Sequence, residues 1–188
     1  MLDVQTTALS GVLIITPARH GDARGFFSES WNRAQMREAG IEIDFVQDNH
    51  SLSAKVGTVR GLHFQSPPHA QAKLVRCARG ALCDVVVDIR RGSPTYGQGL
   101  SIDLTFENGR QVLVPVGFLH GFVTRSPDTE IAYKCSDYYA PDCDGAVRWD
   151  SCGIDWGIAP GDALLSAKDA AAPALADFVS PFVWEGAA

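Results

Sequence analysis

Basic side chains are scarce in this sequence and nowhere form a run. Sixteen lysines and arginines stand against 22 aspartates and glutamates, which gives a formal net charge of −6 at pH 7. Proteins that bind nucleic acid normally carry a basic patch or stripe. The overall charge therefore argues against nucleic acid as a partner, although it leaves room for a local cationic pocket.

Long hydrophobic runs and targeting signals are absent too. No stretch approaches the roughly 20 apolar residues of a membrane-spanning helix. Residues 1–10 have neither a basic beginning nor a long apolar segment, so we expect no secretory signal and no membrane partner. The chain has no internal repeat, and its one biased segment is the alanine-rich stretch 170–176.

The sequence contains no Cys-x-x-Cys pair, the spacing typical of zinc sites. Its five cysteines are an odd number and are scattered along the chain, at Cys77, Cys83, Cys135, Cys143 and Cys152. Free thiols in a reducing compartment fit this pattern better than disulfides do. We therefore predict a cytoplasmic protein without structural zinc.

What remains is the composition of a globular protein, with 188 residues of which 46% are hydrophobic and 20% charged. A chain of this length can bury a sizeable core within one domain. We expect a single domain over residues 1–188. It would comprise an N-terminal arm over about 1–50, a barrel core over about 51–140 and a loop-rich tail over about 141–188.

Short segments with alternating hydrophobicity dominate the chain. One run, residues 81–88, is almost continuously apolar and indicates a central buried strand. The other predicted strands are residues 11–16, 45–52, 59–65, 72–77, 99–106, 111–114, 118–124 and 130–136. Many short strands without intervening helices predict an all-β fold, an antiparallel sandwich or barrel, most simply a double-sheet jelly roll.

Turn and cap signals complete this prediction. The tripeptide at 107–109, Glu-Asn-Gly, predicts a hairpin between the flanking strands. Residues 31–39 have helical character and end at Gly40, and Ser166 is placed to cap a short helix in the tail. Residues 22–29 fit two alternatives, a surface turn leading into an edge strand or a loop that presents Arg24 and an aromatic platform.

Polar side chains fall on the inward faces of several predicted strands. A lone histidine or tyrosine there is usually a satisfied core residue, but lysine is rarely buried without a reason. Their combination on facing strands predicts an acid–base site with a cationic electrophile. The inward polar residues are Gln47, Asn49, His63, Lys73, His120 and Tyr133.

The position of Arg60 is ambiguous. Strict alternation places Val59, Gly61 and His63 on one face and Arg60 on the other. A β-bulge at Gly61 would bring Arg60 to the face of His63. Without that bulge, Arg60 lies on the outer surface or against a partner chain.

Part of the sequence resembles the cupin superfamily. Residues 109–120, which end in Pro-Val-Gly-Phe-Leu-His, match the second cupin signature up to His120. The first signature needs a His-x-His pair and a glutamate to bind a metal, whereas this chain has His63-Phe64-Gln65. Two separated histidines without a carboxylate at ligand spacing make a poor metal site. We therefore expect a cupin-like barrel without a metal, in which a histidine performs acid–base chemistry.

Several motifs together resemble the dTDP-4-dehydrorhamnose 3,5-epimerase family. They lie at residues 47–51 (QDNHS), 60–65 (RGLHFQ), 71–76 (QAKLVR), 115–122 (PVGFLHGF), 133–139 (YKCSDYY) and 165–169 (LSAKD). The resemblance runs from about residue 11 to 173. Residues 149–152 differ from the residues that the family usually has at these positions. It implies a jelly-roll homodimer that inverts C3 and C5 of dTDP-4-dehydro-6-deoxy-D-glucose without a cofactor, giving dTDP-4-dehydro-L-rhamnose.

The resemblance also implies roles for individual residues. His63 is expected to be the catalytic base, oriented by Asp169. Lys73 is expected to stabilise the enolate oxygen, and Tyr133 to return a proton to the opposite face of the sugar. From its residues alone, Asp169 would be a solvated residue in the first turn of a helix.

Further residues are implied to bind the nucleotide, some of them from the partner subunit's N-terminal arm. Guanidinium groups suit phosphate oxygens, so Arg24 and Arg60 are expected to hold the diphosphate. Phe27 and Tyr139 are expected to enclose the thymine ring. The other lining candidates are Glu29, Gln47, Asn49, His120 and Lys168.

Three alternatives differ in what they predict. A related epimerase that inverts one centre would use the same residues, so the sequence does not separate it from the double epimerase. A non-catalytic binding cupin would lack at least one of His63, Lys73, Tyr133 and Asp169, and all four are present. A metal-dependent cupin would need the missing second histidine.

Overall fold

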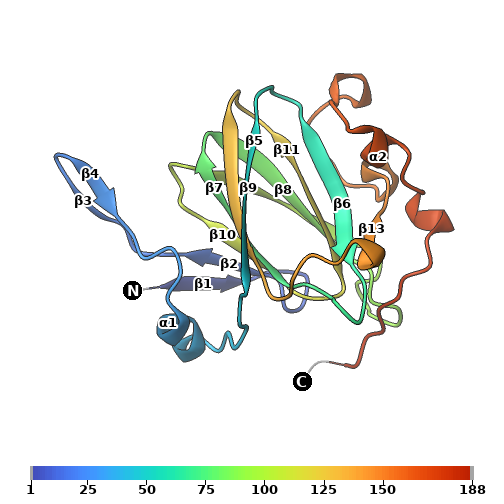
Figure 1. Cartoon of the computed structure of the whole chain (residues 1–188), viewed down its shortest axis with the longest axis horizontal. Coiled ribbons are helices and arrows are strands. Elements are labelled where there is room, and N and C mark those ends of the chain that lie inside the picture. Colours follow the sequence, from blue (N-terminus) through green and yellow to red (C-terminus); the bar gives the residue numbers. More distant parts are fainter. Residues whose placement is uncertain (1, 187–188) are drawn as a thin grey trace.

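Two antiparallel β-sheets packed face to face form the body of the protein (Figure 1). The computed structural model describes residues 2–186. The first sheet has the order β1 (Asp3–Thr6), β2 (Leu13–Thr16), β10 (Gln111–Val114), β7 (Lys73–Arg79), β12 (Thr129–Cys135), β5 (Gln47–Ser53). The second has the order β13 (Asp144–Ala146), β6 (Val59–Gln65), β11 (Phe118–Thr124), β8 (Ala81–Asp88), β9 (Gly99–Thr105). The predicted all-β jelly roll is confirmed.

The main hydrophobic core lies between the two sheets. Val75 and Ile131 point into it from the six-stranded sheet, and Leu82 and Val86 from the five-stranded sheet. Successive side chains of a strand point to opposite faces, so alternate residues of each strand meet here. Burying one such aliphatic side chain contributes about 1.5–3 kcal/mol to stability.

Strand β8 is buried on both faces. Its other side packs with Val85 and Val87 against Trp149 and Trp156 of the C-terminal tail. A strand covered on both faces has no solvent-facing positions, which explains why residues 81–88 form an apolar run instead of alternating. The predicted burial of this strand is confirmed, with the same bounds; in its sheet it lies between β11 and the edge strand β9.

The predicted hairpin at residues 107–109 is wrong in its pairing. The turn itself is tight, since the Oδ1 atom of Asn108 accepts hydrogen bonds from the backbone N–H groups of Thr105 and Arg110, at 3.1 and 3.0 Å. The strands that flank it, β9 and β10, nevertheless belong to different sheets. A turn sequence fixes only its own few residues, and here the chain crosses from one sheet to the other at a corner of the jelly roll.

The N-terminal region contributes strands β1 and β2 to the six-stranded sheet and places helix α1 against it. Strand β1, which pairs with β2, was not predicted because three of its four residues are exposed and show no apolar alternation. Helix α1 (Arg33–Glu38) begins two residues later than predicted, because the Asn32 side chain caps it by accepting from the N–H groups of the next turn. Met36 of this helix packs over Ile15 and Leu113.

A two-stranded ribbon projects from the body, as Figure 1 shows. It consists of β3 (His20–Asp22) and β4 (Gly25–Phe27), and all six of these residues are exposed. Arg19 contacts both the ribbon and the β9–β10 turn. Its guanidinium carbon lies 4.3 Å from the ring centre of Phe26 in the ribbon and 5.4 Å from that of Phe106 in the turn. Such cation–π contacts stabilise by about 0.5–1 kcal/mol at exposed sites, so they help to fix the direction of the ribbon, which we call the arm.

The C-terminal tail runs over the outer face of the five-stranded sheet. It contains 3-10 turns at Pro141–Cys143, Trp149–Ser151, Pro160–Asp162 and Leu175–Asp177, and the short helix α2 (Ala167–Ala170). As predicted, Ser166 caps this helix, because its Oγ accepts from the N–H of Asp169 at 3.1 Å.

All five cysteines are free thiols. In the described chain, neither helix reaches the length or apolar character needed to cross a bilayer.

Candidate active site

A cavity of about 460 Å³ opens between the two sheets, beside α2. Its apolar wall is part of the main core, where Phe122 and Ile131 line it. Five strands and the tail supply polar groups to the same space. The polar lining residues are Ser51, Thr58, Arg60, His63, Lys73, His120, Tyr133, Ser166, Lys168 and Asp169.

His63 and Asp169 form a hydrogen-bonded pair in this cavity. The Nε2 atom of His63 lies 2.5 Å from Oδ1 of Asp169, although the two residues are 106 positions apart. Asp169 is buried, 3% exposed, at the start of α2. An ionised carboxylate only accepts hydrogen bonds, so Nε2 donates and Nδ1 keeps its lone pair. Burial lowers the pKa of His63 below its usual value despite the opposing effect of Asp169, which favours a neutral imidazole at pH 7.

Lys73 brings a positive charge into the cavity from β7. Its side chain lies on the face of Val75, as the alternation predicted. Burial lowers the pKa of its ammonium group, while Cys135, Asp144 and Asp84 favour the charged form. A cation held in partly dry surroundings interacts strongly with any negative charge that develops beside it.

Tyr133 faces the cavity from the sheet opposite His63. It lies on β12 of the six-stranded sheet, whereas His63 lies on β6 of the five-stranded sheet. Burial raises the pKa of the Tyr133 phenol above its ordinary value, so the hydroxyl stays protonated at neutral pH. The two residues are thus suited to act as base and acid from opposite sides of a bound molecule.

A β-bulge at Gly61 settles the position of Arg60. The pairing of β6 with β11 shifts register between His120 and Phe122, and Gly61 has a φ of +120°. A Cβ atom at Gly61 would lie 2.6 Å from the Cα of Gly121, so only glycine fits. Arg60 consequently lines the cavity together with His63. The bulge alternative is confirmed.

The shared face predicted for Val59 and His63 is wrong. Val59 packs in the outer cluster with Leu62, on the side covered by the tail. The extra residue of the bulge interrupts the period of two, so positions before and after it exchange faces. Arg60 is held by its Nε, which donates to Oγ of Ser53 at 3.3 Å, and by its Nη2, which donates to a backbone carbonyl at the same distance.

His120 and Asp84 form a second pair. Nε2 of His120 lies 2.8 Å from Oδ2 of Asp84, and both side chains are buried. His120 stands directly opposite His63 in the pairing of β11 with β6. Sequence reasoning identified His120 but missed Asp84. The available signal was a carboxylate in the middle of the apolar run 81–88.

Lys168, Asp144 and Tyr139 gather at the rim of the cavity. Lys168 lines the cavity and forms an ion pair with Asp144, and this hydrogen bond raises its pKa. The Tyr139 hydroxyl donates to the same carboxylate at 3.3 Å. Asp144 was not predicted, since nothing in the sequence links it to α2, 24 residues later.

Gln47 and Asn49 lie at the edge of the site without lining this cavity. Oε1 of Gln47 accepts from the backbone N–H of Tyr139 at 3.0 Å, and its Nε2 donates to Oδ1 of Asn49 at 3.1 Å. Nδ2 of Asn49 donates to the Cys135 sulfur at 3.5 Å. In one chain, these contacts therefore support β12, which carries Tyr133, and the loop that follows it.

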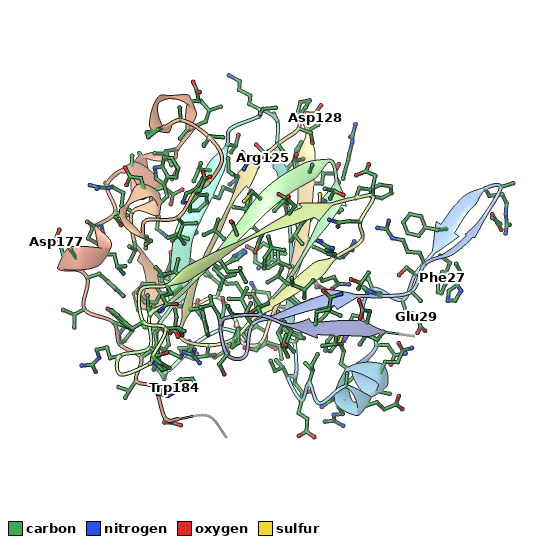
Figure 2. The ribbon with its side chains drawn as sticks, turned by 180° about the vertical axis from the view of Figure 1, so that it is seen from behind. Phe27, Glu29, Arg125, Asp128, Asp177 and Trp184 are labelled. Atoms are coloured by element: carbon green, nitrogen blue, oxygen red, sulfur yellow. The ribbon has the colours of Figure 1, made fainter. Side chains whose placement is uncertain are left out.

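Three predicted binding residues lie on or beside the arm, away from the cavity of their own chain. Arg24 pairs with Asp22 at 2.6 Å and is almost fully exposed, as is much of Phe27. Oε2 of Glu29 accepts from two side chains of the α1 region, at 2.8 and 3.1 Å. Figure 2 shows Phe27 and Glu29 on the opposite side of the molecule from Asp177 in the tail.

The side chains that line the cavity are suited to proton transfer. Within residues 2–186, no three or more His, Cys, Asp and Glu side chains gather in a way that could hold a metal ion. The cavity brings together a neutral imidazole, a protonated phenol and an ammonium group. This combination suits removal of a proton next to a carbonyl group, with the ammonium stabilising the resulting oxyanion.

Comparison with known proteins agrees with this chemistry. Residues 6–177 match the sequence profile of the family described as dTDP-4-dehydrorhamnose 3,5-epimerase. A protein of that name from Salmonella typhimurium is 51% identical over 180 residues, covering 93% of this chain and 96% of that protein.

Solved structures are similar over almost the whole chain. The dTDP-6-deoxy-D-glucose-3,5-epimerase of Legionella pneumophila, in complex with dTDP-4-keto-L-rhamnose, has a TM-score of 0.93 at 40% identity and covers 99% of this chain and 100% of its own. A 3′-monoepimerase from Streptomyces bikiniensis, in complex with dTDP-quinovose, has a TM-score of 0.83 at 35% identity and covers 90% and 86%.

Proposed function

Because the chain belongs to the dTDP-4-dehydrorhamnose 3,5-epimerase family, we propose that it inverts C3 and C5 of dTDP-4-dehydro-6-deoxy-D-glucose and releases dTDP-4-dehydro-L-rhamnose. One observation carries this proposal. The hydrogen-bonded pair of His63 with Asp169 and the phenol of Tyr133 enter one cavity from opposite sheets, and Lys73 lines the same cavity.

The chemistry follows from the acidity of a carbon next to a ketone. Nδ1 of His63 takes the proton from one face of the sugar, and the electron pair moves onto the keto oxygen as an enolate. Lys73 stabilises that oxyanion, and Tyr133 delivers a proton to the other face of the carbon. One proton leaves and one arrives, so the configuration inverts while the oxidation state of the sugar is unchanged.

The nucleotide part of the substrate provides binding energy and orientation. Arg60 and Lys168 place positive charge in the cavity, where they suit the oxygens of a diphosphate. Tyr139 is exposed beside Lys168 and offers an aromatic face to the thymine ring. These charges resolve the apparent conflict between an anionic protein and an anionic substrate.

The active unit that we propose is a homodimer with exchanged arms. Arg24 and Phe27 are exposed on the projecting ribbon, and neither lines the cavity of its own chain. A second copy would receive them at its cavity, where Arg24 binds the diphosphate, Phe27 covers the thymine and Glu29 contributes a polar contact. Each site is then composed of residues from two chains.

Mixed dimers test this exchange. The variants Arg24→Ala and His63→Asn are each expected to lose most activity alone. A purified heterodimer of the two, isolated with two different tags, should regain about half of the wild-type activity, because one of its two sites then contains both native residues. If the arm serves its own chain, neither site is intact, and the heterodimer is no more active than the Arg24→Ala homodimer.

Incubation with dTDP-4-dehydro-6-deoxy-D-glucose in deuterated water tests the reaction. Deuterium at C3 and C5 is followed by NMR, and a coupled reductase traps the product. Incorporation at both carbons with an L-rhamno product is the expected result. Incorporation at one carbon would assign the chain to the single-centre epimerases instead. Binding of the nucleotide without incorporation would contradict catalysis altogether.

A further inference from the structure

Asp84 occupies an unusual position for a carboxylate. It is fully buried in the middle of β8, and its neighbours on the same face, Leu82 and Val86, belong to the main core. Its Oδ2 atom pairs with His120. Its Oδ1 atom is the single buried side-chain nitrogen or oxygen of residues 2–186 that has no hydrogen-bond partner. Such a group costs free energy and calls for a functional explanation.

The pair that Asp84 forms with His120 leaves one ring nitrogen available. Nε2 of His120 is used by Asp84, and the ring lines the cavity. Nδ1 is therefore the nitrogen that remains for a bound molecule. His63 uses Nε2 in the same way with Asp169, and the two histidines are direct cross-strand neighbours. Two imidazoles with equivalent carboxylate contacts thus stand side by side.

The surroundings of the two carboxylates differ. Asp169 lies at the capped start of α2, where Lys168 precedes it and Ser166 bonds its backbone. Asp84 has apolar neighbours and a single hydrogen-bond partner, His120. An ionised carboxylate in such surroundings requires a cation beside it. Paired groups in unlike surroundings commonly divide acid and base roles between them.

We propose that Asp84 is a positioning residue for the epimerisation proposed above. It holds His120 as an imidazolium whose Nδ1–H points into the cavity and donates, together with Lys73, to the oxyanion that develops on the substrate. His63 is then the neutral base and His120 the charged donor. This division explains why a carboxylate is retained in the core although one of its oxygens is unpaired.

All elements around the cavity contribute charges that act on His120 and Lys73. Burial and Lys168 disfavour the cationic form of Lys73, whereas Cys135, Asp144 and Asp84 favour it. The remaining titratable or charged groups that face this space are Arg60, His63, Tyr133 and Asp169. Removing Asp84 takes away the one carboxylate bonded to His120 and leaves the cations in place.

The substitution Asp84→Asn tests the proposal because it removes the charge and keeps the shape. In ¹⁵N-labelled wild-type protein without substrate, both ring nitrogens of His120 are expected to be protonated at pH 7. In the variant the ring becomes neutral. The rate constant kcat falls about 10²-fold, as for loss of an oxyanion donor, and KM changes less than about threefold. The alkaline decline of kcat moves to lower pH.

Asp88→Asn is the matched control. Asp88 is fully buried at the end of the same strand, but its carboxylate accepts from Arg90, Ser93 and Thr95, and none of these lines the cavity. This control is expected to lose stability and to keep the wild-type kcat and pH profile. If Asp84→Asn behaves in the same way, Asp84 is only structural and the proposal is wrong.

A second measurement does not depend on the variant folding. A neutral His120 ring in the wild-type protein at pH 7 would overturn the proposal directly. This NMR measurement uses no substrate, so its result is independent of the proposed function. A wild-type protein that fails to exchange deuterium but keeps His120 protonated would refute the epimerase and leave the charged pair established.

Discussion

Replacing His63 with asparagine is expected to reduce deuterium exchange at both C3 and C5 by at least about 10³-fold. Asparagine has a similar size but accepts no proton at neutral pH, and loss of a general base typically costs 10²–10⁴-fold. Exchange is measured by NMR, and affinity for dTDP by calorimetry. The affinity should change little, because the ring of His63 contacts Asp169 and the sugar site rather than the nucleotide groups.

The large effect follows from the surroundings of His63. Burial lowers its pKa, so the base form prevails at neutral pH and protonation limits the rate only below the usual histidine range. The short contact with Asp169 fixes the ring and its tautomer, as the carboxylate does in a catalytic triad.

His69→Asn serves as the control for this variant. His69 also contacts a carboxylate, with 3.1 Å between its Nδ1 and Oδ2 of Asp137, but it is half exposed and does not line the cavity. Its replacement should leave exchange unchanged. If His63→Asn retained exchange at one carbon, a second base would act there, and the assignment of His63 to both centres would have to be abandoned.

Tyr133→Phe is expected to separate proton exchange from inversion. The variant keeps His63 and Lys73, so the enolate still forms and His63 can return a deuteron to the face from which it took the proton. We expect inversion to fall about 10²-fold while exchange with retention falls less than about fivefold. Both rates are obtained from one NMR time course, which reports deuterium content and configuration at C5.

The geometry of Tyr133 is the reason for this expectation. It approaches from the sheet opposite His63, and burial raises the pKa of its phenol. Tyr96→Phe is the control, since Tyr96 is exposed in the turn after β8, outside the cavity. An equal loss of exchange and inversion in Tyr133→Phe would show that this hydroxyl also acts before the enolate forms, contrary to the role of final acid.

The sequence by itself determined the fold class and part of the cavity lining. A period of two is a local property of each strand, so the inward positions of Lys73, His120 and Tyr133 follow from neighbouring residues alone. The apolar run identified β8 as a buried strand, because a strand covered on both faces has no solvent-facing positions that would alternate with apolar ones. Asp169 came from family resemblance, since its residue type and helical position predict only a solvated carboxylate.

The tertiary structure decided what depends on the path of the chain. The alternation of apolar and polar residues in the sequence does not predict whether a β-bulge forms at Gly61. That bulge determines the face of the strand on which Arg60 lies. The carboxylate partners Asp84 and Asp144 could not be assigned from spacing, because contacts between distant segments depend on which strands become neighbours. The separation of Arg24 from the cavity of its own chain likewise arises from the direction in which the arm leaves the sheet.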